Sequence, residues 1–286
     1  MEKKIILPND IKMAFEYACT QDIRAIKPGN VSMHQSIGDM EYKDFLRSAI
    51  ACSDTIADPK ISLCKRIKKS IEMTKSVVGC NTNLGIILLC APLSNAIFDD
   101  ENHVFKIDSL EKVIKNISKK ETKIIYKSIN KANPGGMGNK HKYDLKDGTS
   151  DFDLYTAMNY AKEYDSIANE YVTNFSLIFN TLSKQWGNYY KKWGNPEYAT
   201  TATFLYHLRD NYDSLIARKH GVNKARKVSE LIKPLANEYI SSKSPNELNN
   251  RLLILDYELK NERINPGTTA DLITASIFVN RLNLLS

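Results

Sequence analysis

The sequence predicts an all-α protein, and three observations carry this prediction. Apolar residues recur at the three- and four-residue spacing of amphipathic helices along most of the 286 residues. Alternating apolar and polar runs bounded by hairpin turns, which are typical of strands, are essentially missing. Glycine is scarce, with 12 residues, and most of it falls between the helical segments. We expect residues 1–286 to form a single compact multi-helix domain.

The apolar spacing divides the chain into successive helical segments. Residues 10–26 place Ile11, Phe15 and Ala18 on one face, and most later segments repeat this amphipathic pattern. Residues 81–98 differ because they are apolar on nearly all sides, so they are expected to form a central buried helix. The expected helices, in chain order, are 10–26, 41–56, 60–78, 81–98, 108–118, 121–131, 151–182 as one helix or two, 200–210, 223–239, 246–260 and 268–284.

The charge balance indicates which partners to expect. The net charge is +7, from 40 Lys and Arg against 33 Asp and Glu. The basic residues are spread along helical segments, as in 65–69, where solvated helix faces account for them. RNA-binding aromatic motifs, zinc fingers and basic regions followed by heptads are not found. Nucleic acid is therefore disfavoured as a partner, and a polyanionic small molecule stays open.

Cysteine usage and the N-terminal residues favour the cytoplasm. The five cysteines are odd in number and contain no CxxC pair, which argues against a zinc ribbon or a disulfide framework. No signal peptide is visible in residues 1–12. The most apolar stretch, 84–93, is about half the length that a membrane span needs. We therefore expect no membrane association.

The first polar motif is Lys27-Pro28-Gly29-Asn30-Val31, which is followed by His34 and Asp39. Pro28 ends a helix and Gly29 permits a tight turn. Lys27 and Asn30 are groups that bind phosphate, and Asp39 is a hard carboxylate ligand for Mg²⁺. A simple connection between two helices is the structural alternative.

The second motif precedes the apolar helix and contains Asn81, Thr82 and Asn83 before Gly85. Asn81 or Thr82 is a good N-cap, and the unpaired amides of a helix start favour an anion. Three consecutive amide or hydroxyl side chains exceed what a cap needs, so we favour substrate binding. Cys80, in the same motif, is the one cysteine that lies among polar residues.

Glycines give the third motif, in which Gly135, Gly136 and Gly138 fall within four residues. Such a loop lets a backbone approach a ligand closely, and it equally makes a flexible connection. The composition of the irregular stretch 133–150 does not separate the two interpretations.

Two further motifs are charged. Glu163, Asp165 and Glu170 fall in the segment 151–182, where Glu163 and Glu170 share a helical face and Asp165 does not; solvation is the favoured interpretation.

The other charged motif places three cationic side chains before Gly221, and they are Arg218, Lys219 and His220. They would either clamp a diphosphate or triphosphate or complement a helix C-terminus.

The last motif, Gly267-Thr268-Thr269-Ala270-Asp271, starts the final helix. Thr268 and Asp271 have the spacing of a capping box. The functional alternative makes Asp271 a Mg²⁺ ligand.

In this order the six motifs resemble the triphosphoribosyl-dephospho-CoA synthase family. The sequences that carry the resemblance are Lys27-Pro28-Gly29 with Asp39-Met40, Asn81-Thr82 with Gly85, and Pro266-Gly267 with Ala270-Asp271-Leu272. The resemblance implies a Mg²⁺-dependent transferase that joins ATP to 3′-dephospho-CoA and releases adenine. It implies roles for Asp39 and Asp271 in metal binding and catalysis, and for His34 or a carboxylate as general base. The implied phosphate- and substrate-binding residues are Lys27, Gly29, Asn30, Asn81, Thr82, Asn83, Gly135, Gly136, Gly138, Arg218, Lys219, His220, Gly267 and Thr268.

One departure from the family pattern concerns the substrate. Family members that use ATP and dephospho-CoA typically have His-Lys where this chain has Asn83-Leu84. The chain looks similar to a divergent archaeal and methylotroph-type branch. This similarity implies, as an alternative, a transferase acting on a phosphorylated intermediate of a one-carbon cofactor of the methanopterin or methanofuran type. A non-catalytic, polyanion-binding helical protein is the second alternative, and a homodimer stays open.

Overall fold

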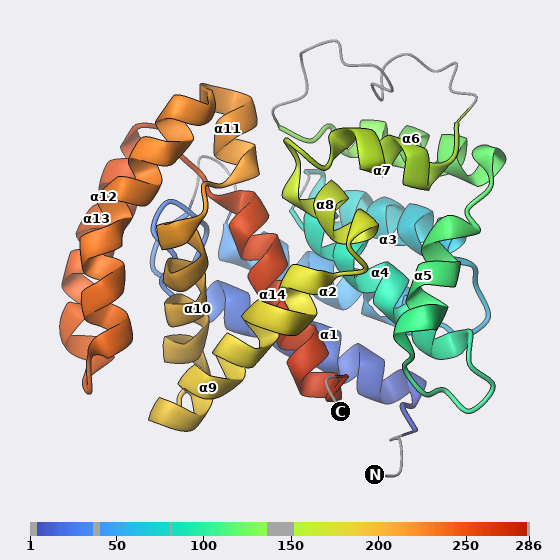
Figure 1. Cartoon of the computed structure of the whole chain (residues 1–286), viewed down its shortest axis with the longest axis horizontal. Helices are drawn as coiled ribbons and strands as arrows, with labels where there is room; N and C mark the ends of the chain where they lie inside the picture. Colours follow the sequence, from blue (N-terminus) through green and yellow to red (C-terminus); the bar gives the residue numbers. More distant parts are fainter. Residues whose placement is uncertain (1–4, 37–40, 81, 136–151, 285–286) are drawn as a thin grey trace.

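Every regular element in the described part of the chain is helical, as the residue spacing predicts. The computed structural model describes residues 5–36, 41–80, 82–135 and 152–284. The first half contains α1 (Pro8–Arg24), α2 (Tyr42–Ile56), α3 (Leu63–Val78), α4 (Leu84–Phe98), α5 (Ile107–Lys115) and α6 (Lys119–Ala132) (Figure 1). The second half contains α7 (Leu154–Ala161), α8 (Ser166–Val172), the π-helical turn η2 (Ile178–Leu182), α9 (Ser183–Trp193), α10 (Pro196–Asp210), α11 (Ser214–His220), α12 (Val222–Ser241), the 3₁₀ turn η3 (Pro245–Leu248), α13 (Asn249–Asn261) and α14 (Gly267–Leu282).

Two helices, and not one, form the centre of the molecule. The predicted central helix α4 is buried along nearly its whole length. It packs against α14, which passes through the middle of the molecule and also contacts α1, α9 and α10 (Figure 1). Hydroxyl side chains of α14 are buried because they bond within the helix: Thr274 Oγ1 donates to the Ala270 carbonyl at 2.9 Å. The sequence predicted a helix over 268–284, but not its central and buried position.

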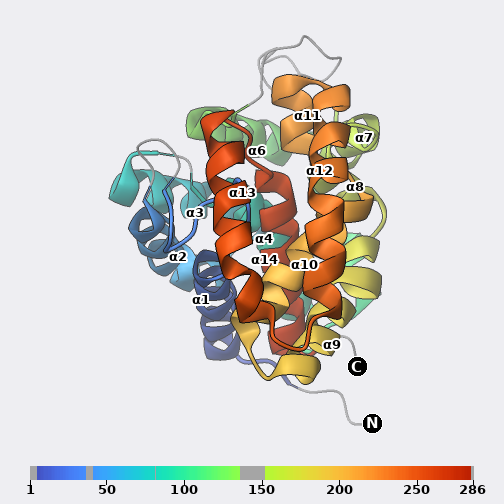
Figure 2. The ribbon, with the colours of Figure 1, turned by 90° about the vertical axis from the view of Figure 1, so that its left-hand side faces the viewer.

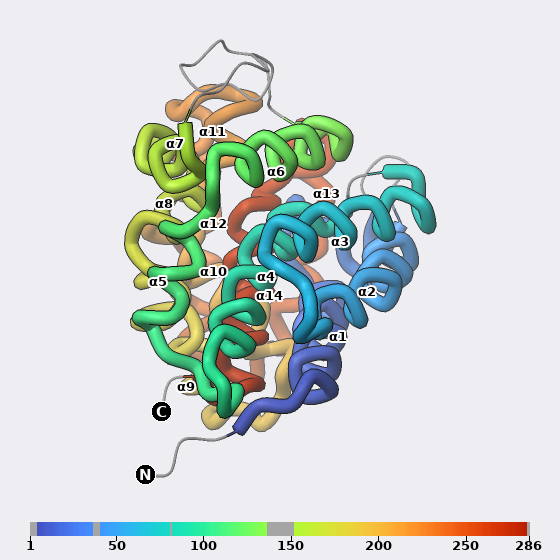
Figure 3. The backbone as a smooth tube through the Cα atoms, turned by 90° about the vertical axis from the view of Figure 1, so that its right-hand side faces the viewer, coloured from blue at the N-terminus to red at the C-terminus, as the bar shows by residue number. Residues whose placement is uncertain are grey.

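The remaining helices cover these two. Helices α3 and α6 contact each other on the side of α4 that Figure 3 shows. Helices α12 and α13 stand at the opposite edge, where α13 lies nearest the viewer in Figure 2. One apolar cluster includes buried residues from Ile6 to Leu284. This cluster supports a single domain, which stays a prediction.

Residues 154–182 correct the prediction of one long helix or two. They form α7, α8 and η2, separated by two breaks. At the first break Asp165 caps α8 by accepting hydrogen bonds from the amides of Ile167 and Ala168. At the second break Asn174 and Phe175 adopt positive φ angles of 53° and 61°. Polar capping thus interrupts a segment whose periodicity alone suggested continuity.

Two α-helices in the described part of the chain were not among those expected from the sequence. One is the short helix α11, and the other is α9. Its aromatic residues stack in pairs: the ring of Trp186 lies 5.3 Å from that of Tyr190, and the ring of Tyr189 lies 5.5 Å from that of Trp193. These stacks lie within α9. Other contacts join the helix to its neighbours: Trp186 Nε1 donates to Thr200 Oγ1 of α10 at 3.0 Å, and the ring of Trp193 packs edge-on against Tyr239 of α12.

Candidate functional site

A cavity of about 1030 Å³ lies between the central helices and the helices beside α4. Side chains from α4, α6, α7, α8, α11 and the start of α14 line it. Its size is at the upper end of the range for small-molecule sites in proteins. The cavity therefore has room for more than one small substrate.

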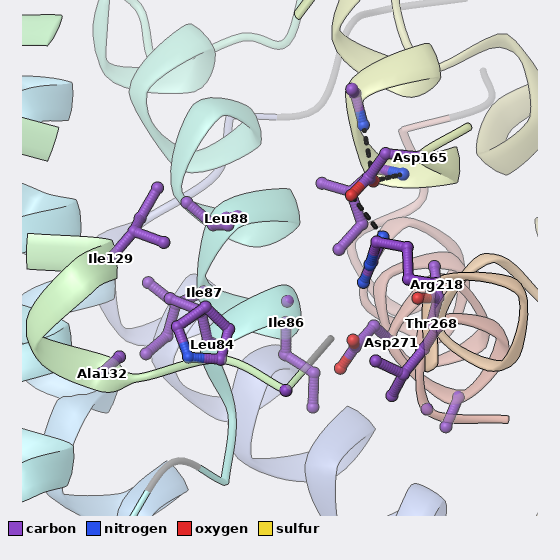
Figure 4. Close-up of a pocket in the computed structure, with 18 of the residues that line it drawn as sticks. Leu84, Ile86, Ile87, Leu88, Ile129, Ala132, Asp165, Arg218, Thr268 and Asp271 are labelled. Carbon is purple, nitrogen blue, oxygen red and sulfur yellow. Dashed lines mark hydrogen bonds and ion pairs between the residues drawn. The ribbon is translucent and has the colours of Figure 1, made fainter. Parts of the chain in front are cut away.

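The two walls of this cavity differ in chemistry (Figure 4). The wall on the α4 side is apolar, and we call it the apolar wall; it contains Leu84, Ile86, Ile87, Leu88, Ile129 and Ala132. The facing wall, which we call the polar wall, contains Asp165, Arg218, Thr268 and Asp271. A ligand that fits both walls has an ionic part and an apolar or heterocyclic part.

Asp271 is the carboxylate that projects into the cavity from α14 (Figure 4). Its side chain lies directly against Gly85 at the start of α4, since a Cβ atom on Gly85 would meet Asp271 Oδ2 at 2.0 Å. Burial raises the pKa of Asp271 well above its usual range, and the negative charges of Asp22 and Asp213 raise it further. The carboxylate of Asp271 can therefore occupy this position only because residue 85 has no side chain.

Asp213 connects two of the helices of the polar wall, α11 and α14. Its Oδ1 atom caps α11 by accepting a hydrogen bond from the Ile216 amide at 2.9 Å. Its Oδ2 atom accepts from the Thr269 amide at 2.7 Å and from the Thr269 hydroxyl at 2.8 Å. Asp213 is fully buried, and this burial raises its pKa while the hydrogen bonds lower it. One side chain thus fixes the start of α11 against the start of α14.

Arg218 is held in the polar wall by a second contact between helices. It forms an ion pair with Asp165, whose other oxygen caps α8. Both side chains are half-buried and line the cavity. This pair joins α8 to α11, so the three helices of the polar wall are tied to one another by carboxylates.

Comparisons with known proteins agree with this architecture. The family model described as ATP:dephospho-CoA triphosphoribosyl transferase (CitG) matches residues 8–286. This chain belongs to that family. The family is one of transferases, so the protein is a transferase. No curated protein matches the sequence.

A solved structure shares the fold of this family member. It is the crystal structure of a "putative triphosphoribosyl-dephospho-CoA synthase" from Archaeoglobus fulgidus. The two chains are 20% identical with a TM-score of 0.60, and the match covers 82% of this chain and 97% of the other. None of the described helices of this family member is long and apolar enough to span a membrane.

Several predicted site residues of this family member line the cavity. Thr268 and Asp271 do so from α14, and Arg218 and Lys219 do so from α11. Gly135 is packed against Lys219, because a Cβ atom there would meet Lys219 Cε at 2.6 Å. The other predicted residues that line the cavity are Asn30, Thr82 and Gly267.

The first motif has a different structural role from the predicted one. Lys27 is 0% exposed, does not line the cavity, and pairs with Asp22 at 2.7 Å while donating to Asn30 Oδ1 at 2.6 Å. Lys27 thus neutralises Asp22, which itself lines the cavity, where we had expected Lys27 to bind substrate phosphate. Gly29 has a φ of +84° and donates its amide to Asp256, so it shapes the loop. His34 is exposed and does not line the cavity.

The second and sixth motifs correct two capping predictions. Helix α4 begins at Leu84 with Asn83 as its N-cap, and no side chain caps it. Asn83 is buried and donates to the Phe45 carbonyl, while the Thr82 hydroxyl contacts Ser48. Helix α14 begins at Gly267 without a capping box from Thr268 and Asp271.

The structure also shows where three other residues from the polar motifs lie, and these are His220, Glu170 and Cys80. His220 is exposed and lies 3.2 Å from the Arg263 carbonyl, outside the cavity. Glu170 is buried, does not line the cavity, and accepts hydrogen bonds from the amides of Leu177 and Ile178. Cys80 lines the cavity, and burial raises the pKa of its thiol, which lowers its reactivity at neutral pH. Asp39, Asn81, Gly136 and Gly138 lie outside the described residues.

Sequence reasoning gave no site role to four residues that build the site, Asp22, Gly85, Asp165 and Asp213, although Gly85 and Asp165 belong to motifs that it named. Gly85 was visible as a glycine at the start of an apolar helix. The three aspartates act through partners that the sequence does not reveal, such as Arg218, which lies 53 residues beyond Asp165.

Proposed function

We propose that this family member catalyses the reaction of ATP with 3′-dephospho-CoA to form triphosphoribosyl-dephospho-CoA and adenine. One observation supports this more than any other: cations and a catalytic-type carboxylate share a cavity of about 1030 Å³ with an apolar wall. The phosphates of a nucleoside triphosphate need the cations, and its base and the acceptor substrate need the remaining volume of the cavity.

The proposed roles follow from position. Arg218 and Lys219, which line the cavity, neutralise the phosphates of ATP. Thr268 and Asn30 orient the ribose and the acceptor by hydrogen bonds. A hydroxyl of dephospho-CoA attacks the anomeric carbon of the ribose, and the new C–O bond forms as the bond to adenine breaks. The cavity carboxylates, and not His34, are the candidates for accepting the proton of the attacking hydroxyl.

Mg²⁺ fits the donor chemistry of Asp271. Its carboxylate is a hard oxygen donor that projects into the cavity, and a cation would relieve its repulsion with Asp22 and Asp213. The described residues contain no cluster of three or more acidic, His or Cys side chains that would hold a metal by themselves. Mg²⁺ typically uses one or two carboxylates together with substrate phosphates, and we propose that arrangement here. The ion would supply charge stabilisation at the phosphates.

The test is direct. Purified protein is incubated with Mg²⁺, ATP and dephospho-CoA, and free adenine and the triphosphoribosyl adduct are measured by mass spectrometry. We expect equal amounts of both products, and none when EDTA replaces Mg²⁺. Binding of Mg²⁺-ATP without either product would reject this acceptor.

Leu84 favours a second candidate, the same chemistry on a one-carbon cofactor intermediate. The residue lies on the apolar wall, at the position where family members that use dephospho-CoA typically have Lys. If this difference changes the acceptor, Leu84→Lys should raise turnover of dephospho-CoA at least about tenfold. Robust turnover by the natural Leu84 enzyme would remove the reason for this candidate.

The incubation also addresses the polyanion-binding alternative. A non-catalytic protein would yield no product, and its affinity for a polyanion would fall steeply with salt concentration. Membership of a transferase family argues against this alternative.

A further inference from the structure

The edge formed by α12 and α13 carries apolar side chains that nothing in the described chain covers. Ile254 and Tyr257 on α13 are each 59% exposed, and Leu231 on α12 is 55% exposed. Asn250, Leu253, Ile254 and Tyr257 line a shallow hollow on this surface. We call Leu231, Leu253, Ile254 and Tyr257 the edge patch.

The two helices bring these residues together. Ion pairs Lys224–Glu262 and Arg251–Glu238 join α12 to α13, so the helices run antiparallel. Leu231 lies midway between Lys224 and Glu238 in sequence and is therefore level with the middle of α13. Figure 2 shows both helices on the face nearest the viewer. The four side chains of the edge patch thus lie on the same edge of the molecule, the one formed by α12 and α13.

The charges beside the patch are arranged to fit a second copy of the same chain. On α13, Arg251 precedes Ile254 by three residues and Glu258 follows it by four, so all three lie along one stripe of the helix. Two copies of α13 that pack antiparallel about Ile254 place Arg251 of each beside Tyr257 and Glu258 of the other. A two-fold interface requires a surface that is complementary to itself. If one residue contacts a second residue of the other copy, the second residue of the first copy makes the same contact in return.

We propose that the protein forms a two-fold homodimer through the edge patch, with α13 of each copy antiparallel to α13 of the other. The apolar side chains form the centre of the interface, and the Arg251–Glu258 pairs fix its orientation. The inner face of α13 carries Asp256, which accepts from the Gly29 amide at 2.7 Å. Dimerisation therefore supports the helix that holds the loop before Asn30, while the cavity lies elsewhere.

The oligomeric state of the full chain in solution tests this proposal. Light scattering after size-exclusion chromatography should show a dimer for the natural protein. Ile254→Lys should raise the dissociation constant at least about tenfold, because it puts two like charges at the centre. Met13→Lys is the matched control, since Met13 is 56% exposed on α1, and it should leave the dimer intact. Circular dichroism confirms that both variants fold.

A charge exchange distinguishes this interface from any other. Arg251→Glu and Glu258→Arg should each weaken the dimer, since each puts like charges opposite one another. The double variant should restore it, although it does not restore the Arg251–Glu238 pair within one copy. A monomeric natural protein at 100 μM, about a hundred times a micromolar dissociation constant, would overturn the proposal. A dimer that is insensitive to Ile254→Lys, or no recovery in the double variant, would do the same.

Discussion

The apolar wall and the polar wall of the cavity are built in different ways. The apolar wall consists of consecutive turns of α4 with α6 beside them, and its residues are adjacent in sequence, such as Ile86, Ile87 and Leu88. The polar wall is assembled from the beginnings of α8 and α14 and from α11, held together by Asp165 and Asp213. The comparison indicates that the first wall depends on helix packing and the second on a few long-range polar contacts. Stability and catalysis should therefore respond to different substitutions.

The largest effect on activity is expected at Asp271, the carboxylate of the polar wall. Asp271→Asn keeps the size of the side chain and removes the negative charge, so turnover should fall at least about 100-fold. Stability should change little or increase, because burial disfavours the charged form. Product formation and urea unfolding measure the two effects. Near-normal turnover would remove Asp271 from the mechanism.

Gly85 is the point where the two walls touch, and its substitution should affect activity next most strongly. In Gly85→Ala the new methyl group would collide with Asp271 Oδ2, which lies 2.0 Å from the Cβ position. We expect a loss of turnover of about tenfold or more as the carboxylate moves. Gly187→Ala in α9 is the control, because its Cβ would meet its nearest neighbour at 3.1 Å, away from the cavity. Equal activities of the two variants would contradict the contact.

A substitution on the apolar wall should lower stability more than activity, which is the opposite of the pattern expected for Asp271→Asn. Ile87 is 1% exposed, so Ile87→Ala should lower the free energy of unfolding by about 2–4 kcal/mol. Turnover at saturating substrate should change only a few-fold, because no reacting group is removed. Comparing this variant with Asp271→Asn sharpens the distinction between the walls. If Ile87→Ala lost activity without losing stability, the distinction would fail.

The smallest expected effect concerns the support of the polar wall by Glu170 on α8. Burial raises the pKa of Glu170 from 4.5 to about 7, although two amides donate to it. The folded chain then binds more protons than the unfolded chain between these pH values, so stability falls as pH rises from about 5 to about 8. The contribution is about 3 kcal/mol at most.

Urea unfolding of Glu170→Gln at the two pH values measures this contribution. The variant should lose less stability than the natural protein over the same range, because it has no proton to release. Glu247→Gln, at an exposed position, is the control and should behave like the natural protein. Parallel pH dependence in all three proteins would show that Glu170 does not titrate in this range.

The sequence predicted the main helix of the apolar wall better than the contacts of the polar wall, and the reason is physical. Helix α4 follows from local periodicity, because a segment that is apolar on all sides must be buried. Asp271 and Gly267 were found because a helix start after Pro and Gly is also a local signal. The direction of the Lys27 side chain was not predicted although its partners are close in sequence: its ammonium group pairs with the buried Asp22 and donates to Asn30. The burial of α14 was likewise hidden, since its hydroxyls bond to its own carbonyls.

Asp213 has a consequence for how the family can diversify. Because this residue accepts hydrogen bonds from both α11 and α14, it couples the helix that carries Arg218 and Lys219 to the helix that carries Asp271. The apolar wall shares none of these hydrogen bonds. Its side chains can therefore be exchanged, during evolution or by design, without removing the hydrogen bonds that hold the polar wall together.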